Sequence, residues 1–358
     1  IGTVVQIDGK QSYDVLDKAL HIVEKLEHRA GKDASGKVGD GVGILLQISD
    51  DFFRNTLKKD NIKLPEHYGV GMFFLPRNKL LLNQHKKMFE KLVEQEGCTF
   101  ITWRKVPCDD SILGQKAKDC MPSIYQAFVQ GDTDLEQKLY VIRREFEKSC
   151  KETYVASLSS RTIVYKGMFL VSQLRKFYFD LQDENYKSAI AIVHSRFSTN
   201  TTPSWQRAHP NRYIAHNGEI NTIRANVNKM LAREESMHSK FLDENSSKIL
   251  PIINTSGSDS AMLDNALEFL VMNGMPLEKA VMILIPEPWK HQTMDQKKKD
   301  FYHYYATMME PWDGPAAILF SDGQKVGAVL DRNGLRPSRY YITDDDTLIL
   351  SSEVGVLP

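Results

Sequence analysis

The stretch HSRFSTNTTPSWQRAHPNRYIAHNGEIN, residues 194–221, decides how this 358-residue sequence is interpreted. An apolar run just ahead of it predicts a strand that delivers Arg196 at its end, and residues 212–216 predict a second strand that ends in Asn217-Gly218. Two strand ends would therefore carry an arginine, hydroxyl groups and an amide. Ligand-binding residues gather at such ends, because a rigid scaffold holds the exposed groups in place.

Each of these residues also has a purely structural interpretation. Asn217-Gly218 is a common β-turn dipeptide, since both residues tolerate positive φ. Arg196 could form a structural ion pair, and His194 and His216 could be buried structural histidines. The sequence has no HExxH motif, no CxxC pair and no His/Cys cluster at ligand spacing, which argues against a metal site. The functional interpretation rests on the combination of these residues.

Periodicity and turn signals predict the elements around this stretch. Strands are expected at 1–7, 70–75, 99–106, 189–193 and 212–216, and helices at 13–28, 78–97, 135–150, 220–235 and from about Asp259 to 271. Four short strands at 316–322, 326–331, 339–343 and 347–353 predict a second antiparallel sheet. Strands at both ends of the chain with helices between them indicate an α+β layered fold.

The motifs SRFSTNT, PSW, AHPNRY and HNGEINT resemble the class II glutamine amidotransferase domain that begins the glutamate synthase large subunit. Further blocks resemble this family in family order: LEHR (26–29), GDGVGILLQI (39–48), SGSDSAMLDNALEFL (256–270), PEPW (286–289), MEPWDGPAAILFSDG (309–323), LDRNGLRPSRY (330–340) and SSEVGV (351–356). The resemblance implies the four-layer αββα sandwich of the N-terminal nucleophile hydrolases. It also implies hydrolysis of the side-chain amide of L-glutamine to glutamate and ammonia.

The same resemblance assigns roles to individual residues. The Asn217 side-chain amide and the Gly218 backbone N–H would form an oxyanion hole. Arg196, assisted by Thr199, would bind the α-carboxylate of glutamine, because a guanidinium matches a carboxylate in two parallel hydrogen bonds. Asp259 would accept the α-ammonium group. Capping of the helix that begins there is the structural alternative for Asp259.

The family nucleophile is a cysteine at the mature N-terminus, whose own α-amine serves as the base. The family pattern there is approximately Cys-Gly-Ile-Gly, whereas the printed sequence begins Ile1-Gly2 and its first cysteine is Cys98. Three explanations stay open: leading residues are omitted, the chain was cut, or the protein lacks the nucleophile and is a glutamine-binding regulatory module. As printed, the chain is expected to show no glutaminase turnover. A purely structural domain would instead have lost glutamine binding altogether.

Composition excludes several other classes of protein. The sequence has 46 lysine and arginine residues and 46 aspartate and glutamate residues. It therefore lacks the excess of positive charge that is typical of nucleic-acid-binding proteins. No apolar run reaches membrane-spanning length, and no signal-peptide pattern is present. The four cysteines, Cys98, Cys108, Cys120 and Cys150, lack cluster spacing. We expect a reduced, cytoplasmic protein with no cofactor of its own.

The resemblance also sets the expected domain organisation and partners. Residues 1–358 would form one amidotransferase domain, in which about 68–182 is an insertion relative to smaller relatives. The expected partner is the synthase part of glutamate synthase, which carries flavin mononucleotide and an iron–sulfur cluster and uses the ammonia to aminate 2-oxoglutarate. An amidotransferase of purine or asparagine synthesis fits less well, because the 330–340 block and the long middle region favour glutamate synthase.

Overall fold

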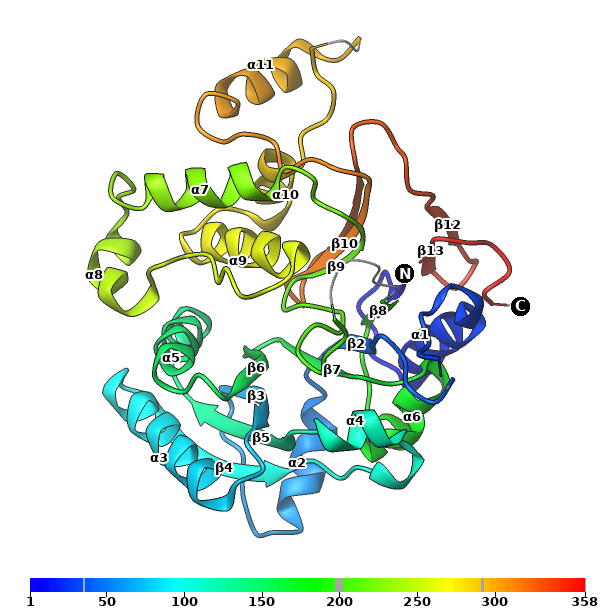
Figure 1. The fold of residues 1–358 in the computed structure, drawn as a ribbon, viewed down its shortest axis with the longest axis vertical. Helices are drawn as coiled ribbons and strands as arrows, with labels where there is room; N and C mark the ends of the chain where they lie inside the picture. Colours follow the sequence, from blue (N-terminus) through cyan, green and yellow to red (C-terminus); the bar gives the residue numbers. More distant parts are fainter. Residues whose placement is uncertain (35, 197–201, 291–292, 358) are drawn as a thin grey trace.

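A computed structural model describes residues 1–34, 36–196, 202–290 and 293–357 (Figure 1). Two antiparallel sheets form its centre. The larger has the strand order β12 (Arg339–Ile342), β13 (Thr347–Ser351), β1 (Gly2–Gln6), β8 (Ile190–Ser195), β2 (Val42–Gln47) and β7 (Thr162–Gly167). The smaller has the order β11 (Val326–Leu330), β10 (Ala316–Ser321) and β9 (Ile214–Gly218).

The two sheets stack face to face through alternate side chains of their strands. Leu45, Ile192 and Leu319 belong to one buried cluster between the sheets. Their strand neighbours, such as Ile44 and Ile318, instead join the clusters on the outer faces. This alternation follows from the two-residue period of a strand, which sends successive side chains to opposite faces.

Helices cover both outer faces of this pair of sheets (Figure 1). The helices are α1 (Tyr13–Lys25), α2 (Asp50–Lys58), α3 (Lys79–Gln95), α4 (Gln115–Asp119), α5 (Leu135–Ser149), α6 (Leu174–Phe177), α7 (Ile223–Arg233), α8 (Lys240–Ile249), α9 (Asp259–Met272), α10 (Leu277–Leu284) and α11 (Gln296–Tyr305), with 3₁₀ turns at Glu27–Arg29, Asp110–Ile112, Val171–Gln173 and Phe179–Gln182. Helix α1 packs on the six-stranded sheet, α9 packs on the three-stranded sheet, and α10 packs against α9 in the same buried cluster. The predicted αββα sandwich is confirmed.

Local sequence explains why α1 forms where it does. The Ser12 side chain accepts a hydrogen bond from the Val15 backbone N–H at 3.4 Å, which caps the helix. Its buried residues, Val15, Leu16, Ala19, Leu20, Ile22 and Val23, recur at helical spacing and form the stripe that faces the sheet.

A further four-stranded sheet lies beside the sandwich, with the order β4 (Thr99–Lys105), β5 (Ser123–Gln130), β3 (Tyr68–Leu75) and β6 (Tyr154–Ser159). Phe73 on one face of this sheet packs with α3 and α5, while Met72 and Phe74 on the other face join the main core. We call β3–β6 with α3 and α5 the four-stranded unit. Strand β7 then returns to the six-stranded sheet, so the end of the 68–182 segment is part of the sandwich. Whether that segment is an insertion relative to smaller relatives stays a prediction.

Two sequence predictions about the strands are corrected. The four C-terminal strands do not form one sheet: β10 and β11 pair with β9, whereas β13 pairs with β1 and carries β12 at the sheet edge. Asn217-Gly218 is no turn, because both residues pair with β10 as the last two positions of β9. Among the described residues, no helix combines the length and apolar character that crossing a membrane requires.

Candidate active site

Arg196 lies directly after β8, where the backbone leaves the six-stranded sheet. Its backbone N–H donates to the Gly41 carbonyl at 2.8 Å, and only 7% of the residue is exposed. Burial lowers the pKa of its guanidinium, while the carboxylates of Asp40 and Asp259 act in the opposite direction. Arg196 and Asp259 are therefore close enough for their charges to interact, although 63 residues separate them in the chain.

Asn217 and Gly218 are the half-buried end of β9, paired with Ala317 and Ala316 of β10. Gly218 has a φ of 154°, and a Cβ at this position would lie 1.8 Å from the Pro315 carbonyl oxygen. Only glycine fits there, because Pro315, just ahead of β10, approaches the backbone too closely for any side chain. The Asn217 side-chain amide carries two N–H donors at this half-buried strand end.

Asp259 is the first residue of α9, but it does not cap that helix. The cap is Ser258, whose hydroxyl accepts from the Ala261 N–H at 3.2 Å. The Asp259 Oδ2 atom instead accepts from the Ile220 N–H at 2.8 Å. The carboxylate is thus fixed two residues beyond Gly218, and the capping alternative is wrong.

Four of the five predicted site residues are therefore placed at the ends of β8 and β9 and the start of α9. Thr199, predicted to assist Arg196, lies outside the described residues. His209 and Ser260 lie inside the quoted motifs AHPNRY and SGSDSAMLDNALEFL, but the sequence did not place either residue beside the site, because no local pattern shows these contacts.

Three histidines form a buried cluster beside these residues. The rings of His194 and His209 lie 4.9 Å apart, and His216 lies two residues before Gly218. Burial lowers the pKa of all three imidazoles, to about 4 for His216. They are consequently neutral at pH 7. Among the described residues, no group of three or more His, Cys, Asp or Glu side chains could hold a metal ion.

Comparison with known proteins decides the family. The model of the glutamine amidotransferases class-II family matches residues 1–358. The chain belongs to this family.

Several relatives of this class II amidotransferase are glutamate synthases. The large chain of the NADPH glutamate synthase of Bacillus subtilis is 49% identical over 368 residues, which is 100% of this chain and 24% of that protein. Ferredoxin-dependent glutamate synthase 2, chloroplastic, of Arabidopsis thaliana is 44% identical, covering 100% and 23%. The NADH glutamate synthase of Saccharomyces cerevisiae is 43% identical, covering 100% and 18%. The chain thus spans a quarter or less of the length of these relatives.

A cavity lies next to the start of α9 in this amidotransferase. It has a volume of about 660 Å³, and its lining includes Arg207, Asn211 and Ser258, the last of which directly precedes Asp259. Cys120 also lines it, and its thiol donates to the Lys116 carbonyl at 3.1 Å.

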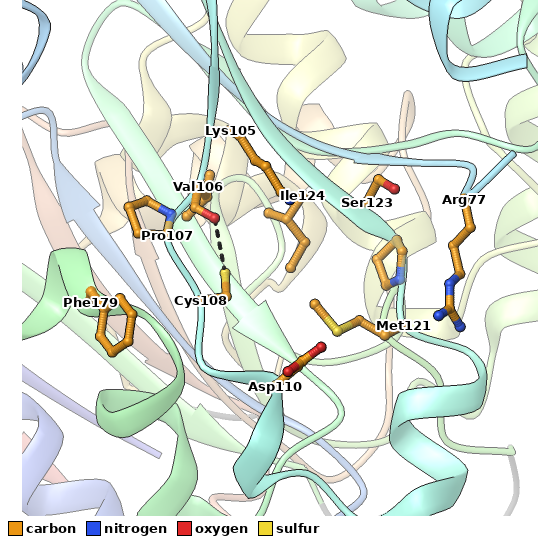
Figure 2. Close-up of a pocket in the computed structure, with 11 residues that line it drawn as sticks. Arg77, Lys105, Val106, Pro107, Cys108, Asp110, Met121, Ser123, Ile124 and Phe179 are labelled. Carbon is orange, nitrogen blue, oxygen red and sulfur yellow. Dashed lines mark hydrogen bonds between the residues drawn. The ribbon is translucent and has the colours of Figure 1, made fainter. Parts of the chain in front are cut away.

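The other cysteines lie in or beside the four-stranded unit. A neighbouring cavity has a volume of about 540 Å³ and shares Arg77 and Met121 with the first. In it the Cys108 thiol donates to the Val106 carbonyl at 3.4 Å (Figure 2). Burial, reinforced by the Asp180 carboxylate, raises the pKa of the Cys108 thiol. Cys98 and Cys150 are buried in the cluster under α3 and α5. None of these three sulfurs has the depressed pKa of a reactive cysteine.

Proposed function

We propose that this chain is the glutamine-hydrolysing domain of a glutamate synthase. It would convert L-glutamine and water to glutamate and ammonia, and the synthase part of the protein would use the ammonia to aminate 2-oxoglutarate. One observation carries the proposal. A buried guanidinium and a fixed carboxylate, Arg196 and Asp259, share an environment beside the two N–H donors of Asn217 and Gly218.

This arrangement suits a zwitterionic amino acid with a side-chain amide. Arg196 would hold the α-carboxylate through paired hydrogen bonds, and Asp259 would accept the α-ammonium, which a glutamine within a peptide lacks. Asn217 and Gly218 would donate to the oxygen that becomes negative when the amide carbonyl is attacked. Strand pairing with β10 positions the backbone that carries both donors, so little rearrangement is needed during the reaction.

The nucleophile in this proposal is a cysteine outside residues 1–358. The family resemblance places it just ahead of Ile1, which is buried between the two sheets together with Ile192 of β8. A residue joined to Ile1 there would adjoin the ends of β8 and β9. Flavin mononucleotide and the iron–sulfur cluster remain predictions for the synthase part.

Ammonia release from L-glutamine by the full-length protein tests the proposal. We expect turnover in the wild type and a decrease of kcat/KM by about 10²–10³ in Arg196→Ala, because a charge-assisted hydrogen-bonded pair is lost. Asp259→Asn should lower kcat/KM comparably. Arg224→Ala, an exposed arginine on α7, is the matched control and should behave as the wild type.

Calorimetric titration with L-glutamine separates the remaining outcomes. Binding that depends on Arg196, without turnover in the full-length protein, would identify a regulatory glutamine-binding module. Neither binding nor turnover would identify a structural domain and contradict the proposal.

A further inference from the structure

One carboxylate holds both sides of the segment that contains Asn217 and Gly218. The Asp259 Oδ2 atom accepts from the Ile220 N–H at 2.8 Å, two residues after Gly218. The Oδ1 atom accepts from the Ser260 hydroxyl at 3.4 Å, and the Ser260 Oγ atom lies 2.8 Å from Nδ1 of His216, two residues before Gly218.

The inner part of this chain of hydrogen bonds is enclosed. His216 and Ser260 are each only 2% exposed. Burial lowers the pKa of His216 to about 4, against the opposing effect of Asp259, so the ring is neutral and carries one N–H. Ser260 Oγ lies between Nδ1 of His216 and Oδ1 of Asp259; we assign the hydroxyl proton to the carboxylate, which leaves the oxygen to accept from Nδ1–H. The Nε2 atom of His216 then keeps its lone pair.

This Nε2 atom lies on the Gly218 side of the ring. It is 2.9 Å from the position that a Cβ of Gly218 would occupy, and it is buried with no hydrogen-bond partner among the described residues. The imidazole therefore packs against the glycine whose backbone N–H is proposed to bind the oxyanion. A shift of the ring would displace that glycine.

We propose that His216 and Ser260 are positioning residues that couple the α-ammonium site at Asp259 to the oxyanion donors. This inference rests on the proposed function. A carboxylate has about four lone-pair sites, and the two hydrogen bonds just described leave capacity for the ammonium group of a substrate. An ammonium bound there fixes the carboxylate, which in turn fixes Ile220 directly and His216 through Ser260. The α-amino group of the substrate thereby contributes to the chemical step as well as to binding.

The test compares L-glutamine with glutaramate, the same amide without the α-amino group, as substrates of the full-length protein. In the wild type, glutaramate should have a kcat at least about tenfold below that of glutamine, in addition to a higher KM. In Ser260→Ala, kcat for glutamine should decrease by about tenfold with KM within about twofold, so the two substrates approach the same kcat.

Conservative and control variants separate positioning from general damage. Ser260→Thr keeps the hydroxyl and should restore the kcat difference between the substrates. Ser247→Ala makes the same truncation at an exposed serine of α8 that does not line the cavity, and it should match the wild type. His216→Asn places an amide N–H near the Nδ1 position and should retain more of the difference than His216→Leu. If Ser260→Ala does not fold, the two His216 variants test the same coupling from the other end of the hydrogen-bond chain.

Two results would overturn the coupling and are distinguishable from each other. Glutamine turnover with an unchanged substrate difference in Ser260→Ala, or with changes in KM alone, contradicts the coupling but leaves the proposed function intact. No glutamine turnover by the wild type contradicts the proposed function, and the coupling with it.

Discussion

The candidate site and the junction of the four-stranded unit with the sandwich both bury polar side chains, but they satisfy them differently. At the junction, Arg104 of β4 donates to both oxygens of Asp180 at 2.7 Å. Gln126 accepts from Arg104 and donates to Tyr165, which donates to Asp180. Each of these four side chains makes at least two hydrogen bonds inside the protein.

The site contrasts with this closed network. Nδ1 of His194, both ring nitrogens of His209 and Nε2 of His216 are buried without a hydrogen-bond partner among the described residues. Leaving a buried polar atom unpaired costs about 1–3 kcal/mol, so each such atom needs an explanation; a few also lie outside the site, such as Nε of Arg143 and Nε1 of Trp312. The closed network indicates a structural role, and the open ring nitrogens next to Gly218 and Asp259 indicate a functional one.

The largest effect that separates the two regions should come from Gly218→Ala. A Cβ would overlap the Pro315 carbonyl oxygen and press on His216. We expect unfolding free energy to fall by about 3 kcal/mol or more and glutamine turnover by about 10²–10³. Gly274→Ala is the control, since it also has positive φ but meets no atom within 4 Å, and should cost only about 1 kcal/mol. Equal losses in the two variants would contradict the account; denaturant titration and initial rates measure both quantities.

Asp180→Ala should have a large effect on stability alone. It leaves the nearly buried Arg104 without its partner, which typically costs about 3–5 kcal/mol. The kcat and KM of the folded variant should stay within about twofold of the wild type, because the junction does not contact substrate. Lys138→Ala, which removes an exposed ion pair in the same unit, should change stability by about 0.5 kcal/mol or less. A tenfold loss of kcat in Asp180→Ala would show that the junction is part of the catalytic machinery.

An effect of intermediate size concerns the pH dependence of stability. The pKa of His216 is about 4 in the folded chain, against about 6.5 when unfolded. Between these values only the unfolded chain binds the proton, so stability decreases as pH falls from 7 to 4, by about 3 kcal/mol for this one residue. His216→Asn should lack this contribution to the pH dependence of stability. Asp259 and Arg336, whose charges act on the pKa of His216, are present in both proteins. If the unfolding free energies of the wild type and the variant changed in parallel between pH 7 and pH 4, the burial of a neutral His216 would be contradicted.

The smallest effects should come from the cysteines around the two cavities. Cys108→Ser and Cys120→Ser should each leave kcat for glutamine within about twofold of the wild type, because neither thiol is assigned to the reaction. Cys120 is the sharper case, since it lines the cavity that adjoins Ser258. Loss of turnover in Cys120→Ser would assign the nucleophile to that residue and contradict the proposal.

Sequence reasoning placed most elements, and its errors have physical causes. Helix α9 begins at Asp259 as expected, because the Ser258 cap and the periodic apolar residues are local signals. Strand β9 was expected at 212–216 but runs from Ile214 to Gly218, since pairing with β10 decides its end. Period-two patterns also could not show which sheet each C-terminal strand joins.

The site was only partly predictable for the same reason. Arg196, Asn217, Gly218 and Asp259 could be identified through motifs, and the structure places them at adjacent element ends. The hydrogen bonds from Asp259 through Ser260 to His216 depend on how α9 meets β9, which no local pattern encodes.

Labelling of the full-length protein with a diazoketone analogue of L-glutamine tests the central claim most directly. Such a reagent alkylates a cysteine held at the amide carbonyl position, and peptide mapping identifies that cysteine. We predict one adduct on a cysteine outside residues 1–358, slowed by glutamine and at least about a hundredfold slower in Arg196→Ala. An adduct on Cys98, Cys108, Cys120 or Cys150, or labelling that is indifferent to glutamine and to Arg196, would contradict the account.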